Sequence, residues 1–488
     1  MFFSNFRSQN NSIFFISLFL SLSIFSGFGD ILLIKDYFIT APELKIIRYR
    51  EFLEIKQYSI YFKYAFIFLV FLINIFFFIR LIKKLKIITK QNYWLIHIFF
   101  IFLIISYLYS YFIYLEFKYL KKVILMTILY NSFLFFTLNE INQNFTKALT
   151  KSIEITFILT LIIFLIVNFI GNQANNYFEF INWPRHSSII SFINIRGNPI
   201  AFILLSLYAC YLKFEKNQFN RFLILFIVLF LIFMLQSRLG IISIILLTFF
   251  FNLNKTKYKK FYLFLFYLSL MIIFAYTFFG AKITNFLFEI FVNQINIIQE
   301  PYSYFENIKK NCPFAGYEYS KIFSQNCEDF LFKVSASFGK SSELFNFLIS
   351  FLYRMSYQYE ALNIVIDSNF KPVFKEFSDL GNHYVTDIGI IRFKNNLFTN
   401  PHNSYLLITL RLTIFGTILI FTFFYLLGKE LIKVNEFNYL ITLIFMLFFH
   451  SFDDFLVGNH LAASLITWIM LGIFFNKIKN DQSLSKNS

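Results

Sequence analysis

The sequence predicts an all-α polytopic membrane protein, and three observations support this fold class. Of its 488 residues, 58% are hydrophobic, 23% are aromatic, and the mean hydropathy is +0.63. Apolar runs of spanning length, or nearly so, recur along the chain with short basic loops between them. One long polar segment, 281–402, interrupts this pattern.

Twelve apolar runs predict about twelve transmembrane helices. Their approximate bounds are 12–28, 59–81, 93–115, 123–138, 151–170, 199–213, 220–236, 239–253, 261–280, 403–427, 438–451 and 457–476. The chain then divides into N-terminal helices (1–150), core helices (151–280), a large loop segment (281–402), C-terminal helices (403–476) and a tail (477–488).

The net charge of +17 is carried mostly by short loops. This distribution is typical of cytoplasmic loops rather than of nucleic-acid binding. The clusters are Arg80, Lys83, Lys84, Lys86 and Lys90; Lys213, Lys216 and Arg221; Lys255, Lys257, Lys259 and Lys260; Lys429 and Lys433; and Lys477 and Lys479. With twelve spans, all five clusters lie on the same side of the membrane, which the positive-inside rule makes cytoplasmic, and the C-terminal tail lies there too. One loop does not fit this pattern, because Lys118, Lys121 and Lys122 would lie on the outer side.

The same topology puts 281–402 on the outer face. Its stretch "SSELFNFLISFLYRMSYQYEALNIVID" predicts amphipathic helices at the membrane surface, so we expect a lid or small domain. Three cysteines exclude a disulfide scaffold. Pairing of Cys312 with Cys327 stays open, and Cys210 is expected to be a packing residue within a helix.

Polar groups interrupt or begin apolar helices at three outer positions. "NIRGNPIAFILL" carries Arg196 and Asn198, with Arg185 upstream; "FMLQSRLGIISIILL" carries Ser237 and Arg238; and "TNPHNSYLLITL" carries His402, Asn403 and Ser404. A buried arginine costs about 2.5 to 3.5 kcal/mol on insertion scales, so it usually faces a partner or a wet cavity. The alternative is a polar anchor that reaches the membrane surface.

These motifs, in this order, resemble the O-antigen ligase family of bacterial membrane glycosyltransferases, which includes polymerase-like members. The resemblance rests on the "NP" turn, "QSRLG", the Arg354-led "RMSYQYEAL" and "PHNSYLLITLRLTIFG", and spans roughly residues 150–476. It implies a metal-independent inner-membrane enzyme with its active site on the periplasmic face and no cofactor. The implied donor is a glycan on undecaprenyl diphosphate, and the acceptor is a sugar hydroxyl on lipid A core.

The chain departs from the family at three positions: Ile200 replaces the second Asn of an NPN turn, Arg411 stands where an acid is common, and Thr413 replaces a common Gly. Arg411 is expected to pair with Asp453 or Asp454, with phosphate binding from within the cavity as the alternative, and we do not interpret "FDDF" as a metal site. His97, His450 and His460 are expected to be packing residues.

The chemistry of such a transfer suits the residue types. Guanidinium groups bind phosphate oxygens bidentately and stay charged, so Arg196, Arg238, Arg354 and, more weakly, Arg185 are candidate diphosphate ligands. A neutral imidazole can accept the proton of the attacking hydroxyl, which makes His402 the candidate base. Direct displacement with one base would invert the anomeric configuration.

Four further residues are expected to support this site. Asn403 or Ser404 is predicted to cap the helix that follows His402. Ser237 and Asn198 are expected to lie beside the candidate arginines of their own motifs.

Two alternatives remain open. A polymerase would use the same donor and transfer the glycan to a lipid-linked repeat. A flippase for lipid-linked oligosaccharides would use the arginines to line a translocation path, although the sequence has no inverted repeat and no matched pair of broken helices.

Overall fold

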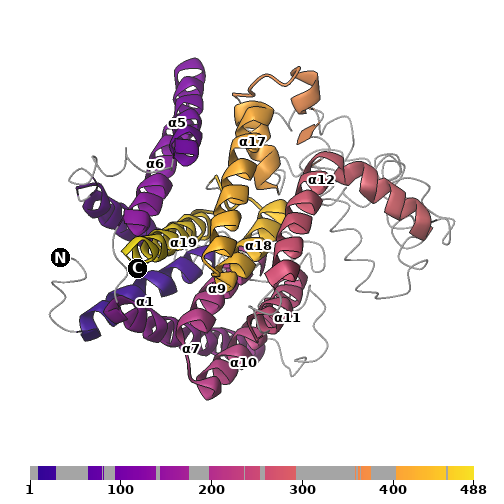
Figure 1. Ribbon diagram of the computed structural model, residues 1–488. Helices are drawn as coiled ribbons and strands as arrows, with labels where there is room; N and C mark the ends of the chain where they lie inside the picture. The colour runs from indigo at the N-terminus through magenta and orange to yellow at the C-terminus, as the bar shows by residue number, and fades with distance from the viewer. Residues whose placement is uncertain are drawn as a thin grey trace.

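The computed structural model describes residues 9–28, 64–79, 81, 94–138, 143–174, 197–235, 237–252, 259–292, 358, 361–362, 364–374, 403–457 and 460–487. Regular structure in these ranges is entirely helical. The helices are α1 (Gln9–Phe28), a helix at Tyr64–Ile79, α5 (Trp94–Tyr114), α6 (Phe117–Leu138), α7 (Gln143–Ala174), α9 (Gly197–Phe214), α10 (Gln218–Met234), α11 (Arg238–Asn252), α12 (Lys259–Val292), α17 (Ser404–Lys433), α18 (Phe437–Phe452) and α19 (Leu461–Asn487) (Figure 1).

Each of the twelve predicted apolar runs contains a helix within its described residues. By length and composition, five helices are long and apolar enough to cross a membrane within the described ranges, and six more are shorter apolar helices. The exposed side chains of these helices include many large apolar residues, such as Phe226, Ile245 and Met271, as expected for a surface that faces lipid. The predicted tail is the end of a helix, because α19 continues to Asn487.

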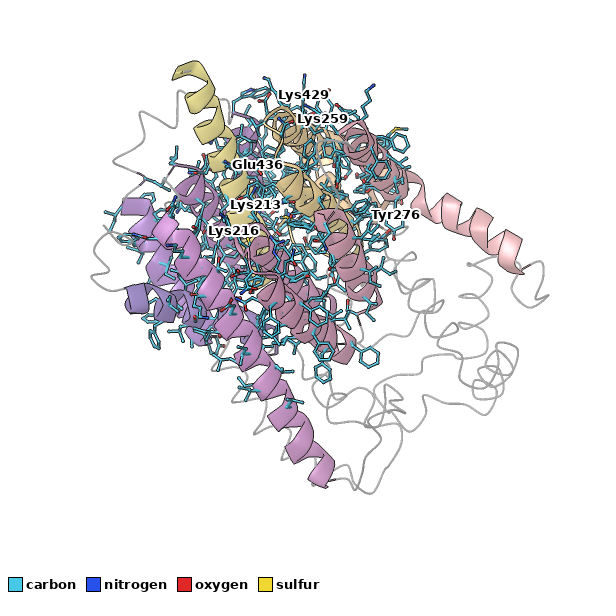
Figure 2. All side chains as sticks on the ribbon, turned by 60° about the horizontal axis from the view of Figure 1, so that its bottom comes forward. Lys213, Lys216, Lys259, Tyr276, Lys429 and Glu436 are labelled. Atoms are coloured by element: carbon cyan, nitrogen blue, oxygen red, sulfur yellow. The ribbon has the colours of Figure 1, made fainter. Side chains whose placement is uncertain are left out.

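Basic residues gather at one end of the helix bundle, which we call the basic end (Figure 2). Glu436, in the connection between α17 and α18, binds Lys213 at the end of α9 (2.5 Å) and Lys477 of α19 (3.5 Å). Lys259, at the start of α12, donates a hydrogen bond to Asn435 Oδ1 (3.1 Å). Residues from four predicted basic clusters therefore share one end, as the alternating topology requires.

The opposite end carries the remaining helix termini. Tyr208 of α9 and Thr248 of α11 are joined by a hydrogen bond (3.3 Å) about ten residues from the start of each helix, so α9 and α11 run parallel and begin at the same end. Phe202 in α9 stacks on Phe455 in the α18–α19 connection (4.7 Å). Lys122, one of the three lysines that did not fit the predicted cytoplasmic placement, also lies at this end, because its charge lowers the pKa of Asp454.

Helix α17 is a hairpin rather than the single straight helix predicted for 403–427. Thr413 has φ 63° and ψ −171°, which divides α17 into a short arm, residues 404–412, and a long arm, residues 414–433. Tyr405 packs against Phe421 (4.8 Å), and the hydroxyls of Thr409 and Thr417 lie 2.7 Å apart. Tyr405 and Phe421 would be about 24 Å apart in a straight helix, so the arms are antiparallel.

Part of the predicted outer loop packs on the short arm. Residues 361–362 and 364–367 are helical. Ala361, Ile364 and Val365 form a small apolar cluster with Leu406 and Leu410. The break at Thr413 frees the carbonyl of Leu410, which accepts a hydrogen bond from the Val373 amide (2.7 Å). The described residues between 358 and 374 therefore pack on the bundle, and those at 361–362 and 364–367 are helical, as predicted; most of the stretch predicted to form helices at the membrane surface lies outside the described residues.

Candidate functional site

The start of the short arm lies inside the bundle. Asn403 is fully buried, and its Oδ1 accepts hydrogen bonds from the backbone amides of Tyr405 (3.0 Å) and Leu406 (3.1 Å). It is therefore the N-cap, as predicted for Asn403 or Ser404. Its Nδ2 is buried without a hydrogen-bond partner among the described residues, which leaves one strong donor available at the positive end of the short arm.

Ser404 joins the short arm to the α18–α19 connection. Its hydroxyl, fully buried, donates to the Asp453 carbonyl (2.9 Å) and accepts from the Phe455 amide (3.1 Å). Gln358 reaches the same place from the segment 358–374, since its Nε2 lies 3.5 Å from the Ser451 carbonyl. Segments that are distant in the sequence thus meet around Ser404, two residues after His402 in the chain.

Two carboxylates and a histidine lie in this connection. Asp453 Oδ1 is 3.5 Å from His460 Nε2, and both side chains are 6% exposed. Asp454 is fully buried, and its carboxylate lies close to the backbone amide of Val457. We call Asn403, Ser404, Asp453, Asp454 and His460 the polar cluster.

Burial raises the pKa of Asp454 to about 6, although Lys122 and His460 act to lower it. Asp453 raises it further, whereas the backbone amide of Val457 lowers it. A carboxyl group with such a pKa can hold or release a proton near neutral pH, which suits acid–base chemistry.

The histidine predictions are confirmed in part. His450 is fully buried and packs beside the stacked rings of Phe202 and Phe455, as expected for a packing residue. His97 contacts the Tyr130 hydroxyl within the α5–α6 pair. His460 is more than a packing residue because it is the partner of Asp453. The sequence signal for the pair of Asp453 and His460 is that they stand at the two ends of the short connection between the apolar helices α18 and α19.

Arg411 does not make the predicted pair with Asp453 or Asp454 among its described contacts. Its Nη1 donates to Ser110 Oγ (2.9 Å) and to the Phe374 carbonyl (2.7 Å). The guanidinium also stacks on the ring of Tyr107, 4.5 Å from its centroid. Arg411 lies near the tip of the hairpin, one turn or more beyond the polar cluster, because the chain reverses at Thr413.

Ser237 has a capping role in the α10–α11 hairpin. Its hydroxyl accepts from the Gly240 amide (3.1 Å), and its carbonyl accepts from the Ile241 amide (2.9 Å). A Cβ at Gly240 would lie 2.8 Å from Ile232 Cγ2, so the motif "SRLG" permits a tight turn. Arg238 is the first residue of α11, at the same end as the polar cluster.

Asn198 is likewise in the first turn of α9. For Arg238 and Asn198 the structure describes the backbone alone. Arg185, Arg196, Arg354, His402, Cys312 and Cys327 lie outside the described residues. Cys210 is a packing residue, as predicted, and its Sγ lies 3.1 Å from Met470 Sδ.

Thr413 connects the fold to one departure from the family resemblance. Its backbone angles lie in a region that is accessible essentially only to glycine, and a β-branched residue there is strained. The chain therefore holds this backbone conformation at a cost in strain.

Comparisons with protein-family models, curated proteins and solved structures found no match. Residues of the described chain do not form a group of three or more His, Cys, Asp or Glu side chains that could hold a metal ion.

Proposed function

We propose that this protein is a membrane glycosyltransferase of the O-antigen ligase type. In this proposal it has twelve spans, with the basic end in the cytoplasm and residues 281–402 on the periplasmic side of the inner membrane. It moves a glycan from undecaprenyl diphosphate to a sugar hydroxyl of lipid A core.

The polar cluster carries the proposal. His402 directly precedes Asn403 and Ser404, which are fully buried against Asp453 and the rest of the α18–α19 connection. The starts of α9 and α11, where Asn198 and Arg238 lie, are at the same end of the bundle. That the described residues of the three motifs lie toward one end of the bundle supports a single active site there.

The proposed reaction is a direct displacement. The acceptor oxygen attacks the anomeric carbon, its proton passes to His402, and the bond between that carbon and the diphosphate oxygen breaks. The electron pair leaves with the diphosphate, where Arg196, Arg238 and Arg354 stabilise the charge. The buried carboxylates of Asp453 and Asp454 would favour the protonated form of His402.

The start of the short arm also supports the proposal. The short arm begins at Asn403, so the positive end of its helix dipole and the Asn403 Nδ2 donor lie within the polar cluster. Such an N-terminus favours an anion, and a lipid diphosphate is one. A polymerase that extends a lipid-linked repeat would use the same groups and differ only in the acceptor.

One observation favours a different class. Transporters often bind substrates at discontinuous helices, and α17 is such a helix, which the sequence did not predict. A flippase that recognises the lipid diphosphate is therefore the second candidate.

Purified full-length protein distinguishes these functions. It is incubated in detergent with a defined lipid-linked donor and either core oligosaccharide or lipid-linked repeat as acceptor. We expect a new glycosidic bond to core oligosaccharide, and loss of at least a hundredfold in rate with His402→Ala. Extension of the repeat alone would identify a polymerase. If neither acceptor reacts although the donor crosses liposome membranes in the presence of the protein, the transferase proposal is wrong.

A further inference from the structure

An apolar cavity of about 280 Å³ lies among the N-terminal helices, away from the polar cluster. Its walls come from α1, the helix Tyr64–Ile79, α6, α7, α9 and α19, and nearly all the lining side chains are aliphatic or aromatic. Phe15 of α1 and Leu72 of the helix Tyr64–Ile79 line it and are also 46% and 47% exposed, so the cavity opens between these two helices to the periphery of the bundle. In a membrane, the medium at that opening is hydrocarbon.

The few polar side chains in the walls are already bound within the protein. The Ser132 hydroxyl donates to the Ile128 carbonyl of its own helix (2.9 Å), and Asn74 Nδ2 donates to the Val70 carbonyl (3.1 Å). The remaining amide oxygen, Asn74 Oδ1, has almost no accessible surface, so a molecule in the cavity does not reach it. In the described part of the chain, the lining contains no charged side chain. The walls therefore select an uncharged, apolar occupant.

Neither water nor empty space suits this cavity. A buried water needs about three polar partners, which these walls do not supply. An empty cavity destabilises a protein in proportion to its volume, because the lining groups lose their dispersion contacts. Apolar cavities that exclude water bind apolar molecules instead. The molecule with access to this opening is a lipid chain.

The cavity lies in the half of the bundle near the basic end. Asn476 of α19 precedes Lys477 of the basic end and donates to the Thr137 carbonyl (3.3 Å), so α6 ends there. Phe136 lines the cavity two residues before the end of α6, and Phe145 lines it two residues after the start of α7. A chain that fills the cavity therefore comes from the leaflet at the basic end.

The helix Tyr64–Ile79 spans the cavity. Phe66 near its start packs on Phe19 of α1, with ring centroids 5.9 Å apart, and Phe77 near its end stacks on Phe135 of α6 (3.8 Å). Phe19 and Phe77 also line the cavity. An apolar occupant would therefore fill the space between the two contacts that hold this helix to the bundle.

We propose that this cavity binds one acyl chain of a phospholipid from the leaflet at the basic end, whatever its headgroup. The chain enters between Phe15 and Leu72 and packs against the apolar walls, while the headgroup stays at the membrane surface. The site is independent of the proposed transfer reaction.

Photocrosslinking of the full-length protein in bilayers tests the site. The bilayer is dioleoyl phosphatidylcholine with a small fraction of phosphatidylcholine that carries a diazirine in mid-chain, and mass spectrometry identifies the labelled residues. We expect labels on Leu149 and Ile466, which line the cavity and are only 9% and 3% exposed, as well as on the outward-facing Phe226 of α10. Ile420 and Leu443, which are buried but do not line the cavity, should stay unlabelled. A phosphatidylglycerol probe with the same chains should give the same pattern.

Two variants that block the cavity complete the test. Leu72→Trp obstructs the exposed mouth, and Ser132→Leu fills the interior while removing only a hydrogen bond within α6. Both should remove most of the label from Leu149 and Ile466 and leave that on Phe226. Ser132→Ala, the matched control, removes the same hydroxyl without filling the cavity and should keep the wild-type pattern. Absence of label from Leu149 and Ile466 in the wild type, unchanged labelling in both blocking variants, or labelling by only one of the two headgroups would overturn the proposal.

Discussion

Replacement of Ser404 by alanine should destabilise the bundle strongly, since one hydroxyl serves two buried backbone groups. The variant leaves the Asp453 carbonyl and the Phe455 amide without their present partner in a fully buried site. An unsatisfied buried group costs about 1 to 3 kcal/mol. Because the released loop can relax in part, we expect the free energy of unfolding to fall by about 2 to 4 kcal/mol.

Ser464 of α19 supplies the matched control. It is also fully buried, but its hydroxyl has no hydrogen-bond partner among the described residues. Ser464→Ala should therefore leave stability unchanged or raise it slightly. Equilibrium unfolding in mixed detergent micelles, followed by tryptophan fluorescence, measures both variants, since Trp468 is buried and donates to the Leu456 carbonyl (2.9 Å). Similar free energies for the two variants would refute the bridging role of Ser404.

Three further variants test other parts of the structure. Burial raises the pKa of Asp454 to about 6, so the folded state binds a proton that the unfolded state releases, and stability should fall by about 2 kcal/mol as pH rises from 4 to 7. Asp454→Asn should flatten this part of the dependence of stability on pH, and an unchanged dependence would contradict the assignment. Gly428→Ala should cost about 1 to 3 kcal/mol in the same unfolding assay, because the new Cβ would lie 2.1 Å from Phe266 Cζ between α17 and α12; a neutral effect would exclude this close contact. Thr413→Gly should stabilise the hairpin by about 1 kcal/mol through relief of strain, and a loss of stability would argue against the positive φ.

The helices could be predicted from the sequence because apolar length is a local property. All twelve runs contain a helix within their described residues, and the basic clusters identify the end that they share. Helix ends were less accurate. Helix α12 continues to Val292 through the largely apolar stretch "AKITNFLFEIFV", which was predicted to belong to the loop segment 281–402. Helix α19 continues to Asn487 through polar sequence, where hydropathy gives no signal.

The hairpin in α17 escaped prediction because hydropathy does not report backbone direction. Residues 403–427 form one apolar run in which only a threonine marks the break. The sequence signal was the position of Thr413, where the family pattern commonly has glycine. The same reversal explains the wrong partner assigned to Arg411: in a straight helix it would point along the bundle, whereas the hairpin turns it toward α5 and Phe374.

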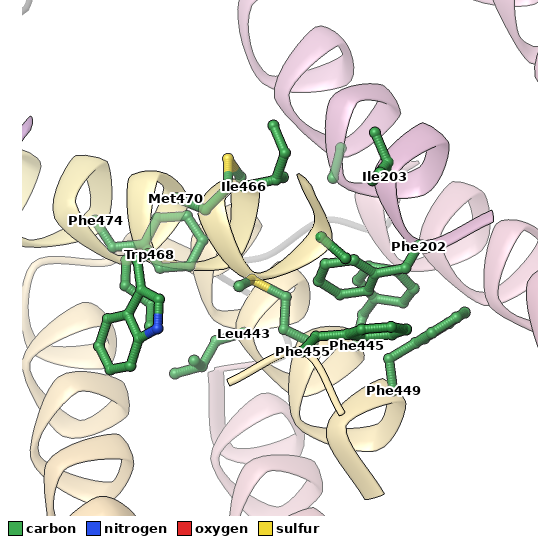
Figure 3. Packing of buried hydrophobic residues seen from close by; sticks show 14 of the residues in the cluster. Phe202, Ile203, Leu443, Phe445, Phe449, Phe455, Ile466, Trp468, Met470 and Phe474 are labelled. Atoms are coloured by element: carbon green, nitrogen blue, oxygen red, sulfur yellow. The ribbon is translucent and has the colours of Figure 1, made fainter. Parts of the chain in front are cut away.

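The packing beneath the polar cluster bears on the choice between transfer and transport. A transporter needs a polar route that continues from the binding site toward the other side of the membrane. In the described bundle, the side of the cluster that faces the basic end is occupied by Phe202, Phe445, Phe449 and Phe455, with ring centroids 4.7 to 6.4 Å apart (Figure 3).

All four of these rings are at most 7% exposed. To open a route here, α9 would have to separate from α18 and expose several stacked aromatic rings, each worth about 1.5 to 3 kcal/mol of burial. A transferase needs no such opening, because donor and acceptor reach the polar cluster from the same side. The solid aromatic layer therefore favours chemistry at one face of the membrane over passage through it.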